Sequence, residues 1–129
     1  MNDSTSLECP FCHPEPARVL DGNELAMAVA DAFPVSPGHT LVIPRRHVSD
    51  FFELSPGELA AVVEMLFRMR SRLAAQDQPA GFNLGVNVGA AAGQTVMHVH
   101  VHLIPRFFGD ATEPQGGVRN VIKGKGRYP

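Results

Sequence analysis

A run of alternating histidines near the C-terminal end constrains this chain more than any other feature of its sequence. His98, His100 and His102 are separated by single apolar residues, and the apolar pair Leu103 and Ile104 follows them. Successive side chains of a β-strand point to opposite faces of a sheet, so this alternation predicts a strand with one core-facing side. The three imidazoles are then expected together on the opposite side, as a row.

Such a row of imidazoles allows three chemical interpretations. Three imidazoles and a water molecule are a common ligand set for a catalytic metal. Alternatively, one imidazole acts as a nucleophile while its neighbours carry protons and bind phosphate. A purely structural row is the weakest interpretation, because burying three imidazoles just after the polar pair Gln94 and Thr95 would cost much desolvation free energy. The residues alone leave the metal and the nucleophile open.

Length and composition indicate a single domain with a packed core. The chain has 129 residues, a hydrophobic content of 44% and a formal net charge of -2. This charge gives no reason to expect nucleic acid as a partner. No apolar run approaches the roughly 18 residues that a membrane-spanning helix needs, and the first six residues do not resemble a signal peptide. We therefore expect a cytoplasmic protein without membrane or nucleic-acid partners, and a single domain over residues 1–129.

The two cysteines, Cys9 and Cys12, form a C-x-x-C pair. In a reducing compartment such a pair is more often a metal site or a redox centre than a structural disulfide. The redox interpretation is the weaker one, because Pro14 and Pro16 follow and disfavour the helix that a thioredoxin-type centre requires. Two thiols at this spacing can bind one tetrahedral zinc ion, and the adjacent His13 is a rival ligand.

The remaining pattern predicts an α+β fold. Ser55 is a good N-cap, Pro56 suits the first helical position, and Glu58 completes a capping box, so a long helix is expected over residues 55–76. Apolar side chains recur at helical spacing through this segment. Residues 24–30 fit either a strand or a helix, but a predicted turn at 21–23 favours a strand. The expected strands are 18–20, 24–30, 39–44, 81–88 and the histidine strand.

The segment after Asp110 departs from this pattern. Residues 111–129 form a basic, Gly-rich tail beyond a core of about 8–110. Such a tail can clamp phosphate groups through arginines and backbone N–H groups. It can equally be a mobile tail or an arm that lies on a partner subunit.

The motif from His98 to Ile104 resembles the signature of the histidine triad (HIT) superfamily, in which three histidines alternate with apolar residues. The segments 93–96 and 105–110 resemble the fragile histidine triad branch of dinucleoside polyphosphate hydrolases, and 37–44 resembles a strand motif of the family. This resemblance implies an antiparallel sheet of about five strands with one long helix and a short helical turn. It also implies a homodimer formed by the helix and the adjacent strand.

The resemblance implies a nucleotidyl hydrolase or transferase that cleaves at the α-phosphate of dinucleoside polyphosphates or related nucleotide conjugates. His100 would attack phosphorus and form a nucleotidyl-histidine intermediate. The alternatives are a nucleoside phosphoramidase and a nucleotide sensor that does not catalyse a reaction. The resemblance implies a catalytic group of His98, His100, His102 and Gln94. Asp31 would contact the ribose of the substrate, and the phosphates would be contacted by Asn87, Gln94, Thr95, His100 and His102. His39 would orient the triad.

A subset of the superfamily binds a structural zinc ion, and this chain offers the corresponding residues Cys9, Cys12, His47 and His98. A Cys₂His₂ set is closed, so the ion would have no open position for catalysis. No redox cofactor is expected, and magnesium is expected only as a companion of the phosphate substrate. Fragile-type hydrolases generally lack the C-x-x-C pair, so the chain mixes features of two branches.

Overall fold

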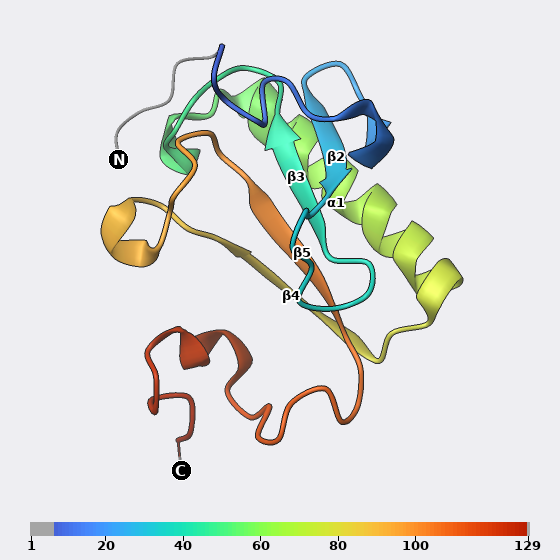
Figure 1. The fold of residues 1–129 in the computed structure, drawn as a ribbon, viewed down its shortest axis with the longest axis vertical. Coiled ribbons are helices and arrows are strands. Elements are labelled where there is room, and N and C mark those ends of the chain that lie inside the picture. Colours follow the sequence, from blue (N-terminus) through green and yellow to red (C-terminus); the bar gives the residue numbers. More distant parts are fainter. Residues whose placement is uncertain (1–6, 129) are drawn as a thin grey trace.

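The computed structural model describes residues 7–128 as a five-stranded antiparallel sheet with one long helix on it (Figure 1). The spatial order of the strands is β1-β2-β3-β5-β4. The elements are β1 (Val19–Gly22), β2 (Ala26–Ala30), β3 (Thr40–Pro44), α1 (Pro56–Asp77), β4 (Gly81–Val86) and β5 (Val101–Arg106). The predicted α+β fold, including the strand at residues 24–30, is confirmed.

Helix α1 begins as the sequence predicts. The Ser55 side chain accepts a hydrogen bond from the Glu58 N–H, and the Glu58 carboxylate accepts one from the Ser55 N–H. These reciprocal bonds satisfy two backbone donors that a helix start otherwise leaves unpaired. The helix ends at Asp77, and its C-cap residue Gln78 has a φ of 52°, in the left-handed region.

The apolar residues of α1 divide into two stripes. The buried stripe packs against β2, β3 and β5 and consists of Val62, Met65, Met69 and Leu73. The second stripe, Leu59, Val63 and Phe67, remains 42%, 42% and 73% exposed. Helical spacing alone identifies both stripes as apolar, but only the packing shows which of them faces the sheet.

The opposite face of the sheet is covered by the N-terminal segment. Cys9 and Phe11 pack there against Val29, Leu41 and Ile43. The apolar residues that pack under α1 and those that pack under the N-terminal segment therefore lie on the two sides of one sheet. For this reason β3 is buried along its whole length. This packing brings the C-x-x-C segment onto the same side of the sheet as the histidines.

The predicted turn at residues 21–23 is displaced. Asp21 and Gly22 belong to β1, and the chain turns between Asn23 and Ala26 instead. The reason is the Asn23 side chain, whose Oδ1 accepts hydrogen bonds from the N–H groups of Leu25 and Ala26. An asparagine that bonds its own backbone two or three residues on replaces the Asp-Gly turn expected from the sequence.

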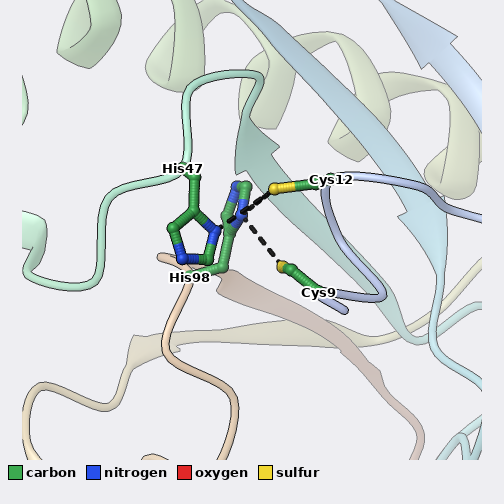
Figure 2. A group of neighbouring side chains, drawn as sticks. All are labelled: Cys9, Cys12, His47 and His98. Atoms are coloured by element: carbon green, nitrogen blue, oxygen red, sulfur yellow. Dashed lines mark hydrogen bonds between the residues drawn. The ribbon is translucent and has the colours of Figure 1, made fainter. Parts of the chain in front are cut away.

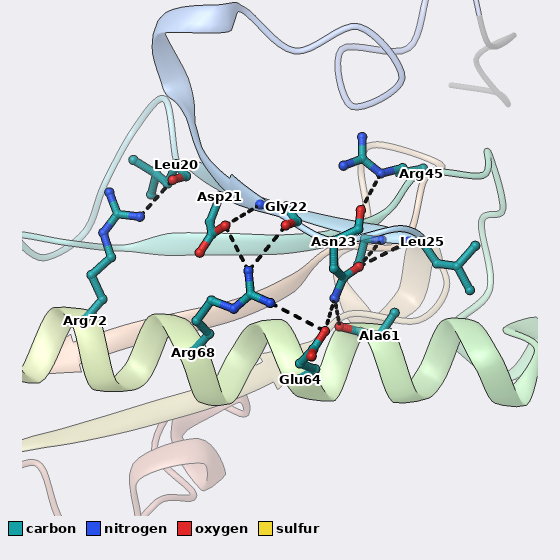
Figure 3. A network of polar contacts seen from close by, with 11 residues as sticks. Leu20, Asp21, Gly22, Asn23, Leu25, Arg45, Ala61, Glu64, Arg68 and Arg72 are labelled. Carbon is teal, nitrogen blue, oxygen red and sulfur yellow. Dashed lines mark hydrogen bonds and ion pairs between the residues drawn. The ribbon is translucent and has the colours of Figure 1, made fainter.

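A polar network fastens this hairpin to the helix (Figure 3). Arg68 donates to the Asp21 carboxylate, and Asn23 donates to the Glu64 side chain. Arg72 donates to the carbonyl of Leu20. The late arginines of α1 therefore serve the packing of β1 on the helix.

The histidine strand is shorter than predicted. Strand β5 begins at Val101, so of the three histidines only His102 lies within the sheet ladder. The ladder stops here because Pro44 has no N–H to donate and its carbonyl accepts from the His98 ring instead, at 2.7 Å. The preceding segment is held separately by a hydrogen bond from the Val99 N–H to the carbonyl of Val48.

Short 3₁₀ turns complete the described chain: η1 (Pro16–Arg18), η2 (Phe51–Glu53), η3 (Ala90–Ala92) and η4 (Gly117–Val121). The last of them belongs to the C-terminal segment, residues 111–128, which lies beside β4. Within residues 7–128, no helix combines the length and the apolar character needed to cross a membrane.

Candidate active site and metal centre

The orientation of His100 follows from one hydrogen bond. Its Nδ1 lies 2.8 Å from the backbone carbonyl oxygen of His98. A carbonyl can only accept, so Nδ1 carries the proton and Nε2 carries the lone pair. Nε2 has no hydrogen-bond partner within the described residues. It is also not one of the polar atoms buried there without a partner, so it is accessible from the solvent. The lone pair of His100 is therefore available for attack on an electrophile.

A chain of hydrogen bonds sets the proton of His102 in the same way. The Val35 N–H donates to Nδ1 of His39 at 3.2 Å, which leaves the proton of His39 on Nε2. That Nε2–H lies 3.0 Å from Nδ1 of His102, which must accept. Neutral His102 consequently carries its proton on Nε2, which can act as a donor. The imidazole of His102 lines a cavity.

Burial favours the neutral forms of His39 and His102, the two histidines that this hydrogen bond joins. Burial lowers the pKa of His39, and the nearby Asp31 carboxylate, 3.4 Å from its Nε2, opposes this shift. Burial also lowers the pKa of His102, and His100 and His39 add to the effect. A neutral His39–His102 pair preserves the hydrogen-bond direction derived above, because protonating His39 would remove its acceptor for the Val35 N–H.

Phe11 connects the C-x-x-C segment with the nucleophile candidate. Its ring lies 4.9 Å from that of His100 and 6.0 Å from that of His98, between centroids. His100 and His102 are themselves 5.3 Å apart. The imidazole of His100 is thus held between an aromatic side chain from the N-terminal segment and its neighbour in the motif.

Cys9, Cys12, His47 and His98 form a second cluster, in which all four candidate ligand atoms lie within 4.8 Å of one another (Figure 2). The Nδ1 of His98 is 3.4 Å from the Cys9 sulfur and 3.5 Å from the Cys12 sulfur, and the His47 Nδ1 is 3.2 Å from the Cys12 sulfur. Tetrahedral zinc ligands lie about 3.3–3.8 Å apart, given zinc–ligand bonds of about 2.0–2.3 Å. The spacing therefore fits a zinc ion.

The chemistry of this donor set agrees with the spacing. The Nε2–H of His98 donates to the Pro44 carbonyl, so its Nδ1 presents a lone pair to the two sulfurs, as metal-binding histidines do. Burial and the neighbouring Cys9 thiol raise the pKa of Cys12 to about 11. Two thiolates side by side are therefore unfavourable unless a cation lies between them. His13 is absent from this cluster of described residues.

The structure brings the other predicted site residues to different positions. Asp31 lies beside His39, and Asn87 lines the same cavity as His102. Thr95 is exposed. Gln94 is buried, and its amide bonds backbone groups of Ser49, Gly89 and Val96. Gln94 thus holds the loop before the histidines, and its contact with phosphate stays a prediction that requires these bonds to open.

The structure argues against a catalytic metal held by all three motif histidines. Among residues 7–128, the groups able to hold a metal are the Cys₂His₂ cluster and the set Asp31, His39 and His102, and neither contains all three. In the second set the nitrogens of His39 and His102 are already joined by a hydrogen bond. The nucleophile interpretation remains the one that the geometry favours.

Sequence reasoning missed three contributors to this site. The Val35 backbone N–H sets the His39 proton, Phe11 packs on His100, and Asn83 lines the cavity near His102. A backbone donor leaves no trace in residue identity, and the contact of Phe11 joins segments distant in sequence. Only its position between two candidate metal-binding cysteines could have drawn attention to Phe11.

The comparisons with known proteins agree on one family. The model of the HIT domain matches residues 14–109. An uncharacterized HIT-like protein of Mycoplasma genitalium is 39% identical over 111 residues, covering 83% of this chain and 79% of that protein. An AP-4-A phosphorylase of Mycobacterium tuberculosis is 37% identical over 108 residues, covering 81% of this chain and 54% of the relative. An asymmetrical bis(5′-nucleosyl)-tetraphosphatase of Schizosaccharomyces pombe is 36% identical over 100 residues, covering 78% and 55%.

A solved structure adds the fold to these sequence matches. A zinc-bound histidine triad family protein from Mycobacterium smegmatis superposes with a TM-score of 0.73 at 34% identity, covering 84% of this chain and 82% of that one. The chain spans only about half the length of the two enzymes named above. With the matched motif, the sheet order and the histidine geometry taken together, the chain belongs to the HIT domain family.

Proposed function

We propose that the protein is a nucleotidyl hydrolase or transferase that cleaves at the α-phosphate of dinucleoside polyphosphates or related nucleotide conjugates. The observation that carries this proposal is the hydrogen bond from His100 Nδ1 to the carbonyl of His98, which leaves the Nε2 lone pair available. The names of two relatives, an AP-4-A phosphorylase and a bis(5′-nucleosyl)-tetraphosphatase, support the substrate class.

In the proposed reaction, Nε2 of His100 attacks the α-phosphorus. A P–N bond forms, the bond from phosphorus to the leaving group breaks, and the leaving group departs with the electron pair. The charge that develops on the imidazole is shared with the His98 carbonyl through the Nδ1–H. The Nε2–H of His102 is the nearby donor for a non-bridging phosphate oxygen. Water or the hydroxyl of another acceptor then attacks phosphorus, the P–N bond breaks and Nε2 regains its lone pair. The proton that the attacking oxygen loses balances the negative charge that departed with the leaving group.

The remaining predicted contacts belong to the same proposal. Asp31 would accept hydrogen bonds from ribose hydroxyls, while Asn87, Thr95 and Gln94 would contact the phosphates, with magnesium as a companion of the substrate. His39 would orient His102 through the 3.0 Å hydrogen bond. The cluster of Cys9, Cys12, His47 and His98 would hold a structural zinc ion, which would supply stability to the N-terminal segment and no reaction step.

We also propose a homodimer. The exposed apolar stripe of α1, Leu59, Val63 and Phe67, lines one concave surface with Pro56, Ala60 and Glu64. Strand β4 is at the edge of the sheet, with Leu84 49% exposed. An apolar helix stripe and an open strand edge are two features that a second copy of the chain would cover.

The decisive experiment traps the intermediate. The wild-type protein is mixed with a radiolabelled adenine nucleotide conjugate, quenched in base, and analysed by peptide mass spectrometry. A nucleotidyl adduct on His100 is expected, and His100→Asn should lose both adduct and turnover while it still binds nucleotide. His13→Asn is the matched control, since His13 lies outside both clusters of described residues. Full turnover by His100→Asn would refute the assignment.

A further inference from the structure

Cys9 and Cys12 stand at the two ends of a tight turn. The Cys12 N–H donates to the Cys9 carbonyl at 3.2 Å, the hydrogen bond that closes a four-residue turn. The end residues of such a turn have Cα atoms less than about 7 Å apart, and a disulfide bond tolerates Cα separations of about 4.4–6.8 Å. The backbone therefore holds the two cysteines at a separation that suits a disulfide bond.

Both side chains of the turn point to the same place (Figure 2). The sulfurs of Cys9 and Cys12 lie 3.4 and 3.5 Å from a single atom, the Nδ1 of His98, and within 4.8 Å of each other. Both thiols are free. Rotation of the two side chains can bring the sulfurs to the disulfide bond length of about 2.05 Å. Once bonded to each other, the sulfurs lose the negative charge with which two thiolates bind a metal ion beside His98.

The two thiols differ in their access to solvent. Cys9 is 1% exposed and packs with Val29 and Leu41, whereas Cys12 is half-buried at the margin of the same apolar cluster. A small oxidant from the solvent therefore meets the Cys12 sulfur first. The Cys9 sulfur beside it is shielded from the oxidant, which is the arrangement of a resolving thiol.

Phe11 connects this turn to the nucleophile candidate. It occupies the position before Cys12, and its ring lies 4.9 Å from that of His100. The turn contacts the rest of the site through its two sulfurs and this ring. A bond between the sulfurs removes them as ligands beside His47 and His98. The turn then loses one of the attachments that hold the Phe11 ring against His100.

We propose that Cys9 and Cys12 are a peroxide-sensitive oxidation site, whose disulfide opens the candidate metal cluster and slows the reaction at His100. The inference rests on the proposed function only for the rate that the disulfide affects. The first element after Cys12 is the short 3₁₀ turn η1 and not the long helix of a thioredoxin-type centre, so the pair acts as a switch and not as a redox catalyst.

The oxidation balances with hydrogen peroxide as the only co-reactant. The Cys12 thiolate attacks one peroxide oxygen, the O–O bond breaks, and the hydroxide that leaves takes a proton from solvent to become water. The Cys9 thiolate then attacks the sulfur of the Cys12 sulfenic acid. The S–O bond breaks, and a second hydroxide leaves and is protonated to water. The two sulfurs lose two electrons in total, and the peroxide gains them.

The test treats the wild-type protein, with the metal that it carries when purified, with hydrogen peroxide that catalase then removes. Peptide mass spectrometry after alkylation of free thiols should find a disulfide between Cys9 and Cys12, with two hydrogen atoms fewer than the reduced peptide. Zinc should appear in a chromophoric chelator, and turnover should fall about tenfold. Reduction with dithiothreitol in the presence of zinc should restore the metal content and the turnover.

Cys12→His is the matched variant, because histidine retains a metal-binding side chain but cannot form the disulfide. Its metal content and its own starting turnover should survive the same treatment. Phe11→Leu should form the disulfide as wild type does but lose less than about twofold in turnover, since its aromatic contact with His100 is already absent. Equal inactivation of wild type and Cys12→His would overturn the proposal, as would reduced cysteines in inactivated wild-type protein.

The NMR signal of the His100 ring, assigned with His100→Asn, is a readout that does not depend on turnover. The disulfide should shift this signal, because the ring current of an aromatic side chain 4.9 Å away changes when that side chain moves. A disulfide that leaves the signal unchanged would also overturn the proposal. Failure of the proposed function has a different signature: no nucleotidyl adduct on His100 in the reduced protein, although the disulfide forms and the signal shifts.

Discussion

The phenyl ring of Phe11 lies 4.9 Å from the imidazole of His100, with 55° between the ring planes. Phe11 is located between the two cysteines of the candidate zinc site, so the segment that would bind the metal also packs on the candidate nucleophile. Aromatic contacts at this distance fix ring orientation as well as adding buried area. The relationship makes Phe11 a positioning residue rather than a core residue alone.

Phe11→Leu should lower kcat about tenfold and leave KM nearly unchanged, because a small displacement of a nucleophile reduces the rate more than it reduces binding. The substitution conserves an apolar side chain, so its effect on stability should stay below about 1.5 kcal/mol. Steady-state kinetics and thermal unfolding check both numbers. Phe52→Leu is the control, since Phe52 is 80% exposed. A purely structural Phe11 would change stability and leave kcat at the wild-type value.

His39 is the subject of the second prediction. His39→Leu removes the donor to His102 Nδ1 and should lower kcat about 10–100-fold, whereas His39→Gln retains an N–H donor and should recover part of the loss. Burial lowers the pKa of both His39 and His102, so the hydrogen bond between their neutral forms should persist below the ordinary histidine pKa of about 6.5, and the rate difference between wild type and His39→Leu should shrink only at lower pH. A pH–rate profile for the wild type, His39→Gln and His39→Leu tests whether their rates decrease in that order. Identical kinetics of the Leu and Gln variants would contradict it.

Loss of the candidate zinc ion should destabilise the fold. Cys9→Ser should contain less than a full equivalent of zinc and unfold with a free energy lower by at least about 3 kcal/mol, because ligand binding to the native state is part of its stability. Elemental analysis and denaturant unfolding, with and without a chelator, provide the measurements. His13→Ser is the control. A Cys9→Ser protein with wild-type metal content and stability would exclude this cluster as the ligand set.

The ion pair of Glu58 and Arg46 gives the fourth prediction. Two hydrogen bonds from Arg46, at 2.8 and 2.9 Å, and one from the Ser55 N–H lower the pKa of Glu58 to about 2. The folded-state pKa lies below the unfolded value of about 4.3, so this stabilisation is complete above about pH 5 and is lost as pH falls toward 2.

Glu58→Gln should therefore cost about 2 kcal/mol at pH 7, and the difference from wild type should shrink as the pH is lowered through this window. Urea unfolding at pH 7, 4.5 and 3 measures it. Glu24→Gln serves as a control because Glu24 is exposed and makes no side-chain hydrogen bond or ion pair within the described residues. A difference that is constant with pH would show that the carboxylate charge of Glu58 is not responsible.

The exposed stripe of α1 gives the fifth prediction. Phe67→Glu should shift the protein from dimer to monomer in sedimentation equilibrium, because a carboxylate would have to be buried at an apolar interface. Phe52→Glu, at a site on η2 that is 80% exposed, should leave the association unchanged. A wild-type protein that sediments as a monomer would refute the dimer.

The sequence predicted most of the fold because the signals were local. The capping box of Ser55 and Glu58 and the β-branched residues of β3 each acted within a few positions. The misplaced turn and the late start of β5 depended on competition for backbone groups, by the Asn23 side chain and by the His98 ring. Residue identity and spacing do not show which partner wins such a competition.

The candidate site was likewise predictable from the sequence only in part. Alternation identified the three histidines, but their different environments arose from contacts between distant segments, such as His98 with Cys9 and His102 with His39. The roles of the site residues remain predictions. The orientation of the Gln94 amide toward backbone groups could not be foreseen, because the same polar side chain can face either a loop or a ligand.

His98 uses a different atom for each of its contacts. Its ring Nδ1 faces the cysteine sulfurs and its ring Nε2–H donates to the Pro44 carbonyl, while its backbone carbonyl accepts a hydrogen bond from the Nδ1–H of His100. Any amino acid at this position would keep the carbonyl, and only a ligand side chain would complete the candidate metal site. A substitution at position 98 can therefore remove a candidate metal ligand and still keep the hydrogen bond that orients the candidate nucleophile, whereas a substitution at position 100 removes the imidazole itself.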